Sequence, residues 1–321
     1  MSVKRFIGSV ALCVGCVLLS WTPATAQVRI GTQHFITASL AGGTGLGMSG
    51  QQMIKPALGG EGQFALSYEV LHNGFFFSFG IGMDYRMSRY KLADGMVDAF
   101  ATQDRDGHDI IYRYVYSNYR ETQQTVSATV PVWFGYRIKD KIYFAFGAKL
   151  AMPVWNNYRT KTDLYTEGIY PNLIEYVSRN VPSYGFYPTA EYEGKGTYKA
   201  PTLSVSPMAE VGGFFRIVPG FSCRIGAYVE YAIPVMGKYA TGDIVDYSAV
   251  DRNPQTQNME NLNQTIRFNS VMDSHVNASA TAHAGENLFK GLSQYLSFGI
   301  RATFRFNVTR TPSVCMCEKD K

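Results

Sequence analysis

Three residue types that can carry hydrolytic chemistry stand together at Asp273, Ser274 and His275. A nucleophilic serine needs a histidine in line with its hydroxyl, and an acid behind that histidine. The side chains of three consecutive residues point apart, so this run cannot relay a proton in line. The sequence therefore predicts no catalytic site and no enzyme.

Two other motifs match ligand-binding patterns by letter only. Residues 45–50 fit the G-x-G-x-x-G form of a dinucleotide site, which requires a βαβ unit with a helix opening at the motif. No such unit follows, so these glycines predict a flexible loop. Residues 104–107 resemble a calcium loop, but Thr102 and Arg113 occupy the positions that require Asp and Glu. We expect neither a cofactor nor a metal site.

The N-terminus has the features of a secretory signal peptide. Lys4 and Arg5 precede an apolar stretch at residues 6–19, and a small-residue site ends at Ala26, after which we expect cleavage. Loss of the two cations lowers the formal net charge from +5 to +3, which argues against a nucleic-acid partner. The remaining cysteines, Cys223, Cys315 and Cys317, do not form an even set, so we expect no disulfide framework. The role of the last two stays open.

Alternating apolar and polar residues define the elements that must position any site. The clearest run places Phe75, Ile81 and Met87 on one face, and Ser78 and Asp84 on the other. Soluble strands keep this period for about six residues, whereas here it continues over the length that crosses a bilayer at a tilt. The eight runs are residues 34–41, 63–71, 75–87, 126–138, 142–154, 203–217, 221–235 and 296–306.

Short and long connections alternate between these runs. The short ones lie at residues 73–74, 139–141 and 218–220; the long ones lie at 42–59, 91–121, 155–199 and 237–291. This layout predicts an all-β fold: a transmembrane antiparallel up-and-down β-barrel of eight strands, with short periplasmic turns and long extracellular loops. Ten strands are the alternative, because an extended segment at 110–116 either adds a pair or projects a hairpin beyond the membrane. We expect the barrel domain at residues 27–308 and a short periplasmic tail at 309–321.

Charge is distributed unevenly in the predicted barrel. The three longest connections hold 13 basic and 17 acidic residues, which predicts an acidic outer rim. Eight strands enclose an interior that side chains fill, and charges in a narrow dry lumen must be paired. We therefore expect an ion-paired network that plugs the lumen, with Arg137, Arg216 and Arg305 nearer the turns. Its members are Asp84, Lys149, Glu210, Glu230 and Arg301.

Aromatic residues recur near the ends of the runs. Such residues form girdles at the headgroup level of barrels that cross a membrane. The candidates are Tyr68, Tyr85, Trp133, Tyr136, Tyr143, Trp155, Tyr231 and Tyr295.

The eight runs, together with a closing run from Tyr295 to the aromatic residue Phe306, resemble a known family. The pattern is similar to that of the OmpA/OmpX-like eight-stranded outer-membrane barrels, and of the outer-membrane β-barrel proteins of Bacteroidota-type bacteria. The resemblance covers nearly the whole mature chain. It implies the outer membrane of a Gram-negative bacterium, contact with outer-membrane lipid and lipopolysaccharide, and recognition of Tyr295 to Phe306 by the barrel-assembly machinery.

We therefore expect a non-enzymatic integral outer-membrane protein. Its plugged barrel would present loops for envelope integrity, adhesion or surface binding to an extracellular ligand, which the loops do not identify. A narrow porin-like channel for small solutes is the alternative, and a lipid-modifying enzyme is a third hypothesis.

Overall fold

The computed structural model describes most of the chain after residue 30. The described residues are 31–48, 54–92, 96–104, 106–139, 141–173, 176–184, 186–236, 242–246, 267–275 and 294–309. The expected leader and tail lie outside these ranges, apart from Thr309, so cleavage after Ala26 and the domain boundaries stay predictions. Cys315 and Cys317 also lie outside them, while Cys223 is a buried free thiol.

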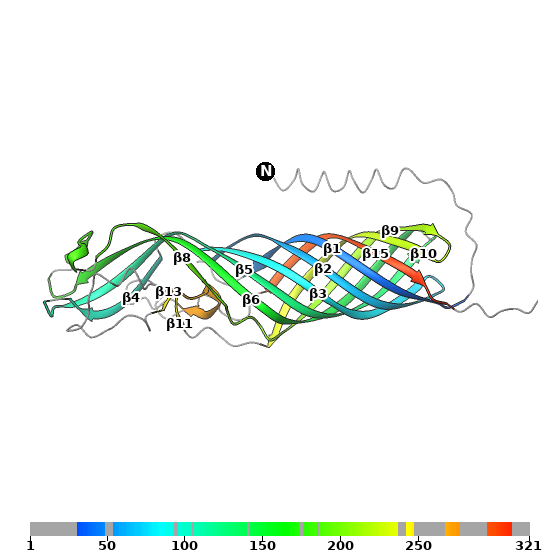
Figure 1. Ribbon diagram of the computed structural model, residues 1–321, viewed down its shortest axis with the longest axis horizontal. Helices are drawn as coiled ribbons and strands as arrows, with labels where there is room; N and C mark the ends of the chain where they lie inside the picture. Colours follow the sequence, from blue (N-terminus) through cyan, green and yellow to red (C-terminus); the bar gives the residue numbers. More distant parts are fainter. Residues whose placement is uncertain are drawn as a thin grey trace, which may run out of the picture. The chain divides into compact units, whose positions relative to one another are not determined.

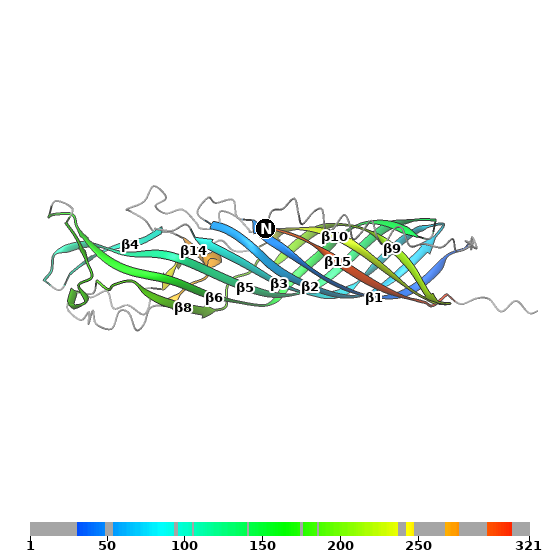
Figure 2. The same cartoon turned by 90° about the horizontal axis from the view of Figure 1, so that it is seen from above.

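Eight antiparallel strands close into a ring, as the sequence predicts (Figures 1 and 2). Each strand pairs with the next in the ring, and the last pairs with the first. Closure leaves no edge, which satisfies the backbone of every ring strand. In order around the ring the strands are β1 (Gln33–Met48), β2 (Ile54–His72), β3 (Phe75–Leu92), β5 (Asp109–Ile138), β6 (Ile142–Tyr170), β9 (Leu203–Val218), β10 (Phe221–Met236) and β15 (Gln294–Asn307).

Three tight turns mark one end of the ring, which we call the turn end. Asn73 and Gly74 both have positive φ, as a two-residue hairpin turn requires. Lys139 and Gly220 have positive φ in the other two turns. Strand β1 begins and β15 ends at this end, where Val308 N donates to His34 O at 2.9 Å.

The opposite end, which we call the outer end, differs from the sequence prediction. Strand β1 continues to Met48 and β2 begins at Ile54, so most of the expected loop 42–59 is strand; residues 49–53 lie outside the described residues. Residues 109–120 and 155–170, expected within loops, instead continue β5 and β6. Residues 110–116 do alternate, but Ile110, Tyr112, Tyr114 and Tyr116 are buried on the opposite parity from the ring part of β5, so the pattern does not continue the ring strand.

These extensions form a second sheet region, which we call the outer sheet. Strand β4 (Met96–Gln103) pairs with the start of β5, while β7 (Tyr176–Arg179) and β8 (Ala190–Gly196) pair with the end of β6. The segment 110–116 thus projects a hairpin and adds no strand to the ring. Short elements nearby are η1 (Pro182–Tyr184), β11 (Gly242–Asp243), β12 (Val245–Asp246), β13 (Arg267–Phe268), η4 (Val271–Asp273) and β14 (Ser274–His275).

The glycines of the G-x-G-x-x-G motif lie in a strand, so the loop expected there is wrong for Gly45 and Gly47. A Cβ on Gly45 would meet the Tyr295 ring at 2.6 Å, and one on Gly47 would meet the Tyr90 hydroxyl at 2.2 Å. These glycines make room for inward-facing tyrosines. Gly50 lies outside the described residues.

Candidate functional site

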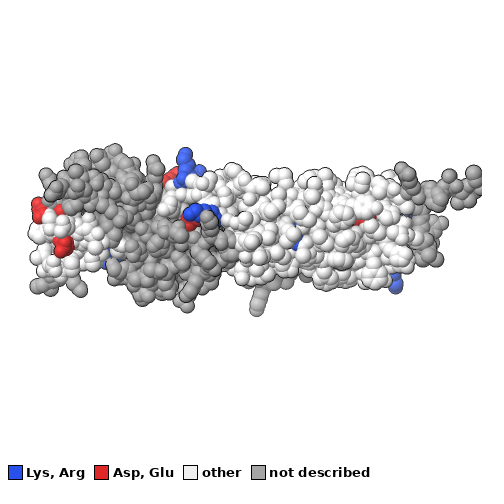
Figure 3. Space-filling view, turned by 90° about the horizontal axis from the view of Figure 1, so that it is seen from below, with Lys and Arg blue, Asp and Glu red and all other residues white. Residues whose placement is uncertain are grey.

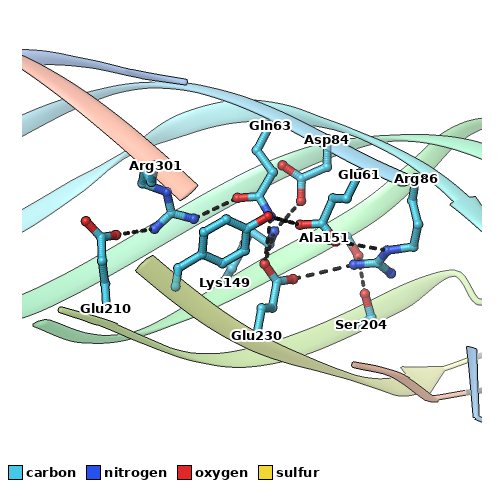
Figure 4. A network of polar contacts seen from close by, with 11 residues as sticks. Glu61, Gln63, Asp84, Arg86, Lys149, Ala151, Ser204, Glu210, Glu230 and Arg301 are labelled. Atoms are coloured by element: carbon cyan, nitrogen blue, oxygen red, sulfur yellow. Dashed lines mark hydrogen bonds and ion pairs between the residues drawn. The ribbon is translucent and has the colours of Figure 1, made fainter. Parts of the chain in front are cut away.

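The lumen of the ring holds a central group of buried charges. Lys149, only 2% exposed, contacts Asp84 and lies 2.6 Å from Glu230 Oε2 (Figure 4). The other Glu230 oxygen accepts from Arg86 Nη2 at 3.5 Å, and Arg86 Nε lies 4.0 Å from Glu61. These five side chains come from β2, β3, β6 and β10, so the group ties together opposite walls of the ring.

A second group lies beside the first, toward the turn end. Arg301 on β15 donates to Glu210 Oε2 at 2.9 Å and to Gln63 Oε1 at 2.7 Å. Its guanidinium lies 4.5 Å from the Trp133 ring and 4.9 Å from that of Tyr228. Gln63 also donates to Glu230 at 2.9 Å, so the two groups form a continuous network.

A third group fills the lumen at the turn end. Glu69, which is fully buried, accepts from Arg305 Nε at 2.8 Å, and its second oxygen lies 2.9 Å from Arg224. Arg224 stacks on Phe76 at 4.3 Å, and Arg305 on Phe35 at 4.0 Å. Aromatic faces attract desolvated guanidinium groups, so these rings stabilise the cations as well as filling space.

The three groups together, which we call the lumen network, balance their charges. The set contains five carboxylates and five cations, so its formal net charge is zero. Buried charges are tolerated when each is paired and hydrogen-bonded. Two cavities that share no lining residue adjoin this network: Lys149 and Arg301 line one, and Arg86 lines the other. The members are Glu61, Glu69, Asp84, Arg86, Lys149, Glu210, Arg224, Glu230, Arg301 and Arg305.

All five residues singled out from the sequence lie in this network. Asp84, Lys149 and Glu230 contact one another, whereas Glu210 and Arg301 pair separately. Sequence reasoning omitted Glu61 and Glu69, which share the inward parity of Gln63 on β2 and so carried a readable signal. Of the cations expected near the turns, Arg305 lies in the network, Arg137 stacks on Phe214, and Arg216 is exposed.

The outer surface of the ring is uncharged and mostly apolar, whereas the lumen is charged. Arg89 on β3 and Arg120 on β5 mark the outer limit of this surface. Between them and the turn end, every described side chain that faces outward is uncharged, and most are apolar. We call this surface the apolar belt; Figure 3 shows it as a nearly uncoloured region with charged side chains at its ends. Its most exposed members include Phe75, Phe79, Ile81, Met83, Phe134, Phe146, Met152, Val154 and Ile300.

Aromatic residues mark both edges of the apolar belt, but fewer than the sequence predicts. Tyr68 and Tyr136 lie near the turn end, and Tyr85 and Trp155 near the outer end, all at least 38% exposed. Tyr143 and Tyr295 are buried in the lumen, and Trp133 turns inward against Arg301. All three have the inward parity of their runs, so their position near a strand end did not by itself indicate a girdle.

The outer sheet has its own buried core, which we call the outer core. Glu121 is 1% exposed and accepts hydrogen bonds from Ser270 Oγ at 2.6 Å and from Val271 N at 2.9 Å. These bonds attach part of the connection between β10 and β15 to the outer core. Burial raises the pKa of the Glu121 carboxyl and outweighs these donors. The core residues are Ile54, Tyr90, Leu92, Ile110, Tyr112, Tyr114, Tyr116, Tyr119, Tyr158, Leu164, Tyr170, Phe186, Tyr198, Ile244, Phe268, Val271 and Met272.

The two remaining sequence motifs have structural roles where they are described. Ligand atoms of Asp104, Asp106 and His108 lie within 4.8 Å of one another. Asp104, however, already accepts from His108 N at 2.8 Å, Asp106 N at 2.9 Å and Tyr170 Oη at 3.0 Å, which closes a turn. Asp273 accepts from Lys199 N at 2.9 Å. The side chains of Ser274 and His275 lie outside the described set.

Comparisons with known proteins add little to this geometry. No family model and no curated protein matches the chain. A solved structure that is similar is the crystal structure of Ail, the attachment invasion locus protein of Yersinia pestis, in complex with the heparin analogue sucrose octasulfate. The match is 12% identical, covers 84% of this chain and 99% of that one, and has a TM-score of 0.23. The eight-stranded barrel is therefore established by its own strand pairing. No helix among the described residues is long and apolar enough to cross a membrane.

Proposed function

We propose that this chain is a non-enzymatic integral outer-membrane protein whose plugged barrel anchors a surface-exposed sheet for envelope integrity, adhesion or surface binding. The observation that carries the proposal is the sidedness of the ring. Ile81, Phe146 and Ile300 are 70%, 67% and 64% exposed outside, while paired charges such as Lys149 are buried inside. Only an apolar medium around the ring stabilises this arrangement.

The height of the apolar belt supports a membrane crossing. Phe75 and Met87 are the first and last outward apolar residues of β3, twelve positions apart. At about 3.3 Å per residue and a tilt of roughly 40°, this stretch rises about 30 Å along the barrel axis. Hydrocarbon cores are about 30 Å thick. The belt therefore matches a single bilayer, with Tyr85 and Trp155 at the outer boundary.

The lumen network supports a plug over an open pore. Lys149, which lines one cavity, and Arg86, which lines the other, are both ion-paired to Glu230. A path for solutes would require these pairs to separate in a low dielectric, which is costly. A narrow channel is the second candidate, favoured by the polar lining of both cavities. Stable unitary conductance steps in planar bilayers would support the channel and contradict the plug.

Heat-modifiable migration tests the barrel and its insertion together. The chain refolded into phosphatidylcholine vesicles should migrate differently on a gel before and after boiling, and should stay with the vesicles in carbonate. Absence of both behaviours would overturn the proposal. Altered lipid A in a strain overexpressing the protein would indicate a lipid-modifying enzyme instead.

Export and assembly complete the proposal. A leader cleaved after Ala26 delivers the chain to the periplasm, and the closing strand β15, which contains Tyr295 and Phe306, is the segment that the barrel-assembly machinery recognises. Strand β15 pairs with both β1 and β10, so it closes the ring. Removal of Phe306 should slow assembly in cells more than refolding in detergent.

A further inference from the structure

Four cations form one row across the outside of the ring, just beyond the apolar belt. Lys55 on β2 lies directly opposite Lys91 on β3, which lies opposite Arg120 on β5, which in turn lies opposite Lys161 on β6. All four side chains are exposed. Directly opposed residues in antiparallel strands have Cβ atoms about 5 Å apart, and like charges there are destabilising.

Only one end of this row is neutralised by the protein. Lys161 forms ion pairs with Glu191 and Glu193 on β8. Among the residues that the structure describes, no carboxylate lies within ion-pair distance of Lys55, Lys91 or Arg120. Arg89, two positions before Lys91, is likewise exposed and unpaired within the described chain. We call Lys55, Arg89, Lys91 and Arg120 the basic row.

The basic row reverses the charge that composition predicts for this end. The long connections are acidic as a whole, yet strand register collects cations at their base. A cluster that repels itself and has no partner in the described chain points to an anion supplied from outside.

The position of the row identifies the source of that anion. Arg89 follows Met87, the last outward apolar residue of β3, by two positions, and Lys91 follows by four. At about 3.3 Å per residue these cations lie within roughly 13 Å of the belt edge along the strand. Their flexible stems reach back toward the boundary, where lipid phosphates lie.

We propose that the basic row binds the phosphate groups of a phosphorylated glycolipid in the outer leaflet, whose acyl chains pack on the apolar belt beneath. This inference rests on the proposed membrane location. Guanidinium groups at Arg89 and Arg120 bind phosphate through two parallel hydrogen bonds, and Lys55 and Lys91 add compact charges. A soluble polyanion would use the charges but leave the adjoining apolar surface without a role.

Native mass spectrometry of the refolded full chain with diphosphorylated lipid A tests the proposal. The variant K55Q/K91Q/R120Q should bind on the order of a hundredfold more weakly, because each cation near an anionic surface contributes about fivefold. The matched control K139Q/R216Q removes two exposed cations at the turn end and should bind within about twofold of the unmodified chain. The unmodified chain should bind lipid A that lacks both phosphates only weakly. The affinity should be about that of the triple variant for intact lipid A.

Three outcomes would overturn the inference: equal lipid A binding by the triple variant, equal binding of the dephosphorylated lipid, or tighter binding of heparin than of lipid A through the same cations. The last would assign the row to a soluble polyanion. Failure here leaves the proposed function intact if all variants still insert into phosphatidylcholine vesicles and show the heat-dependent gel shift. Loss of insertion by the unmodified chain would instead overturn the proposed function.

Discussion

The ring and the outer sheet share strands β5 and β6 but bury opposite kinds of side chain. In the ring, β5 exposes Phe134 at 60% and buries Thr129 at 4%. In the outer sheet the same strand buries Tyr112 and Tyr116, at 2% and 0% exposure. The surrounding medium, rather than the strand itself, therefore decides which face is apolar: an apolar medium favours an apolar exterior, and water an apolar interior.

Two register shifts separate the regions. On β5 the odd-numbered residues face inward in the ring, and the even-numbered ones face inward beyond a bulge between Ser117 and Arg120. Within that bulge, Asn118 has a φ of 52°. A second shift around Val154 changes the parity of β6 in the same sense. Each bulge adds one residue, which exchanges the two faces of the strand that follows.

The largest expected effect comes from breaking the polar interior of the ring. Lys149→Met leaves Asp84 buried without its cation, and leaves Glu230 with Arg86 as its only cation beside the Gln63 amide. We expect a loss of about 3–5 kcal/mol in the free energy of unfolding in vesicles, measured by urea titration. The exposed control Lys195→Met on β8 should change it by less than about 0.5 kcal/mol. Adding Asp84→Asn to Lys149→Met should recover part of the loss; a loss below about 1 kcal/mol would contradict the paired lumen.

A charge on the apolar exterior comes next. Ile81→Lys places a cation in the middle of the apolar belt, where it should cost about 2–4 kcal/mol of unfolding free energy in vesicles. Leu173→Lys is the matched control, because Leu173 is 55% exposed but lies beyond the belt in the outer region. It should have an effect below about 0.5 kcal/mol. Equal costs for the two variants would mean that the two surfaces face the same medium.

The bulge at Asn118 lies where the ring part of β5 meets its outer-sheet part. Valine is strained at positive φ, so Asn118→Val should destabilise the outer sheet by about 1–2 kcal/mol, whereas Asn118→Gly should be nearly neutral. Hydrogen exchange of the β4 and β5 amides measures the effect. The gel shift of the ring should be unchanged in both variants, and its loss would show that the two regions are not separable.

The smallest effect concerns pH at the turn between β4 and β5. Burial alone would raise the pKa of Asp104, but donors from His108 N, Tyr170 Oη and Asp106 N lower it below its ordinary value. Asp104 therefore stabilises the turn above pH about 3.9, and this contribution of about 1 kcal/mol is lost as the pH falls through the folded pKa. Hydrogen exchange of residues 106–110 should show it. In Asp104→Asn, exchange corrected for its intrinsic rate should lose this pH dependence; an unchanged profile would assign it to another group.

Local pattern determined much of the ring. Alternation located all eight strands, and Asn73 and Gly74 predicted a turn that the structure confirms. The same period gave the inward direction of Asp84, Lys149 and Glu230, because side-chain direction repeats every two residues. It also implied an apolar medium, since a run such as residues 75–87 is too long for a soluble strand.

Only the tertiary structure shows which side chains from different strands meet, and how the strands continue at the outer end. The pairing of Arg301 with Glu210, or the alignment of Lys91 with Arg120, depends on the register of strands that do not follow one another directly in the sequence. The bulges at Asn118 and Val154 reset a period that sequence reading had to assume constant. A single chain records which face each residue takes within a run, but a ring fixes which residues from different runs meet, because only closure sets the register of every strand against its neighbours.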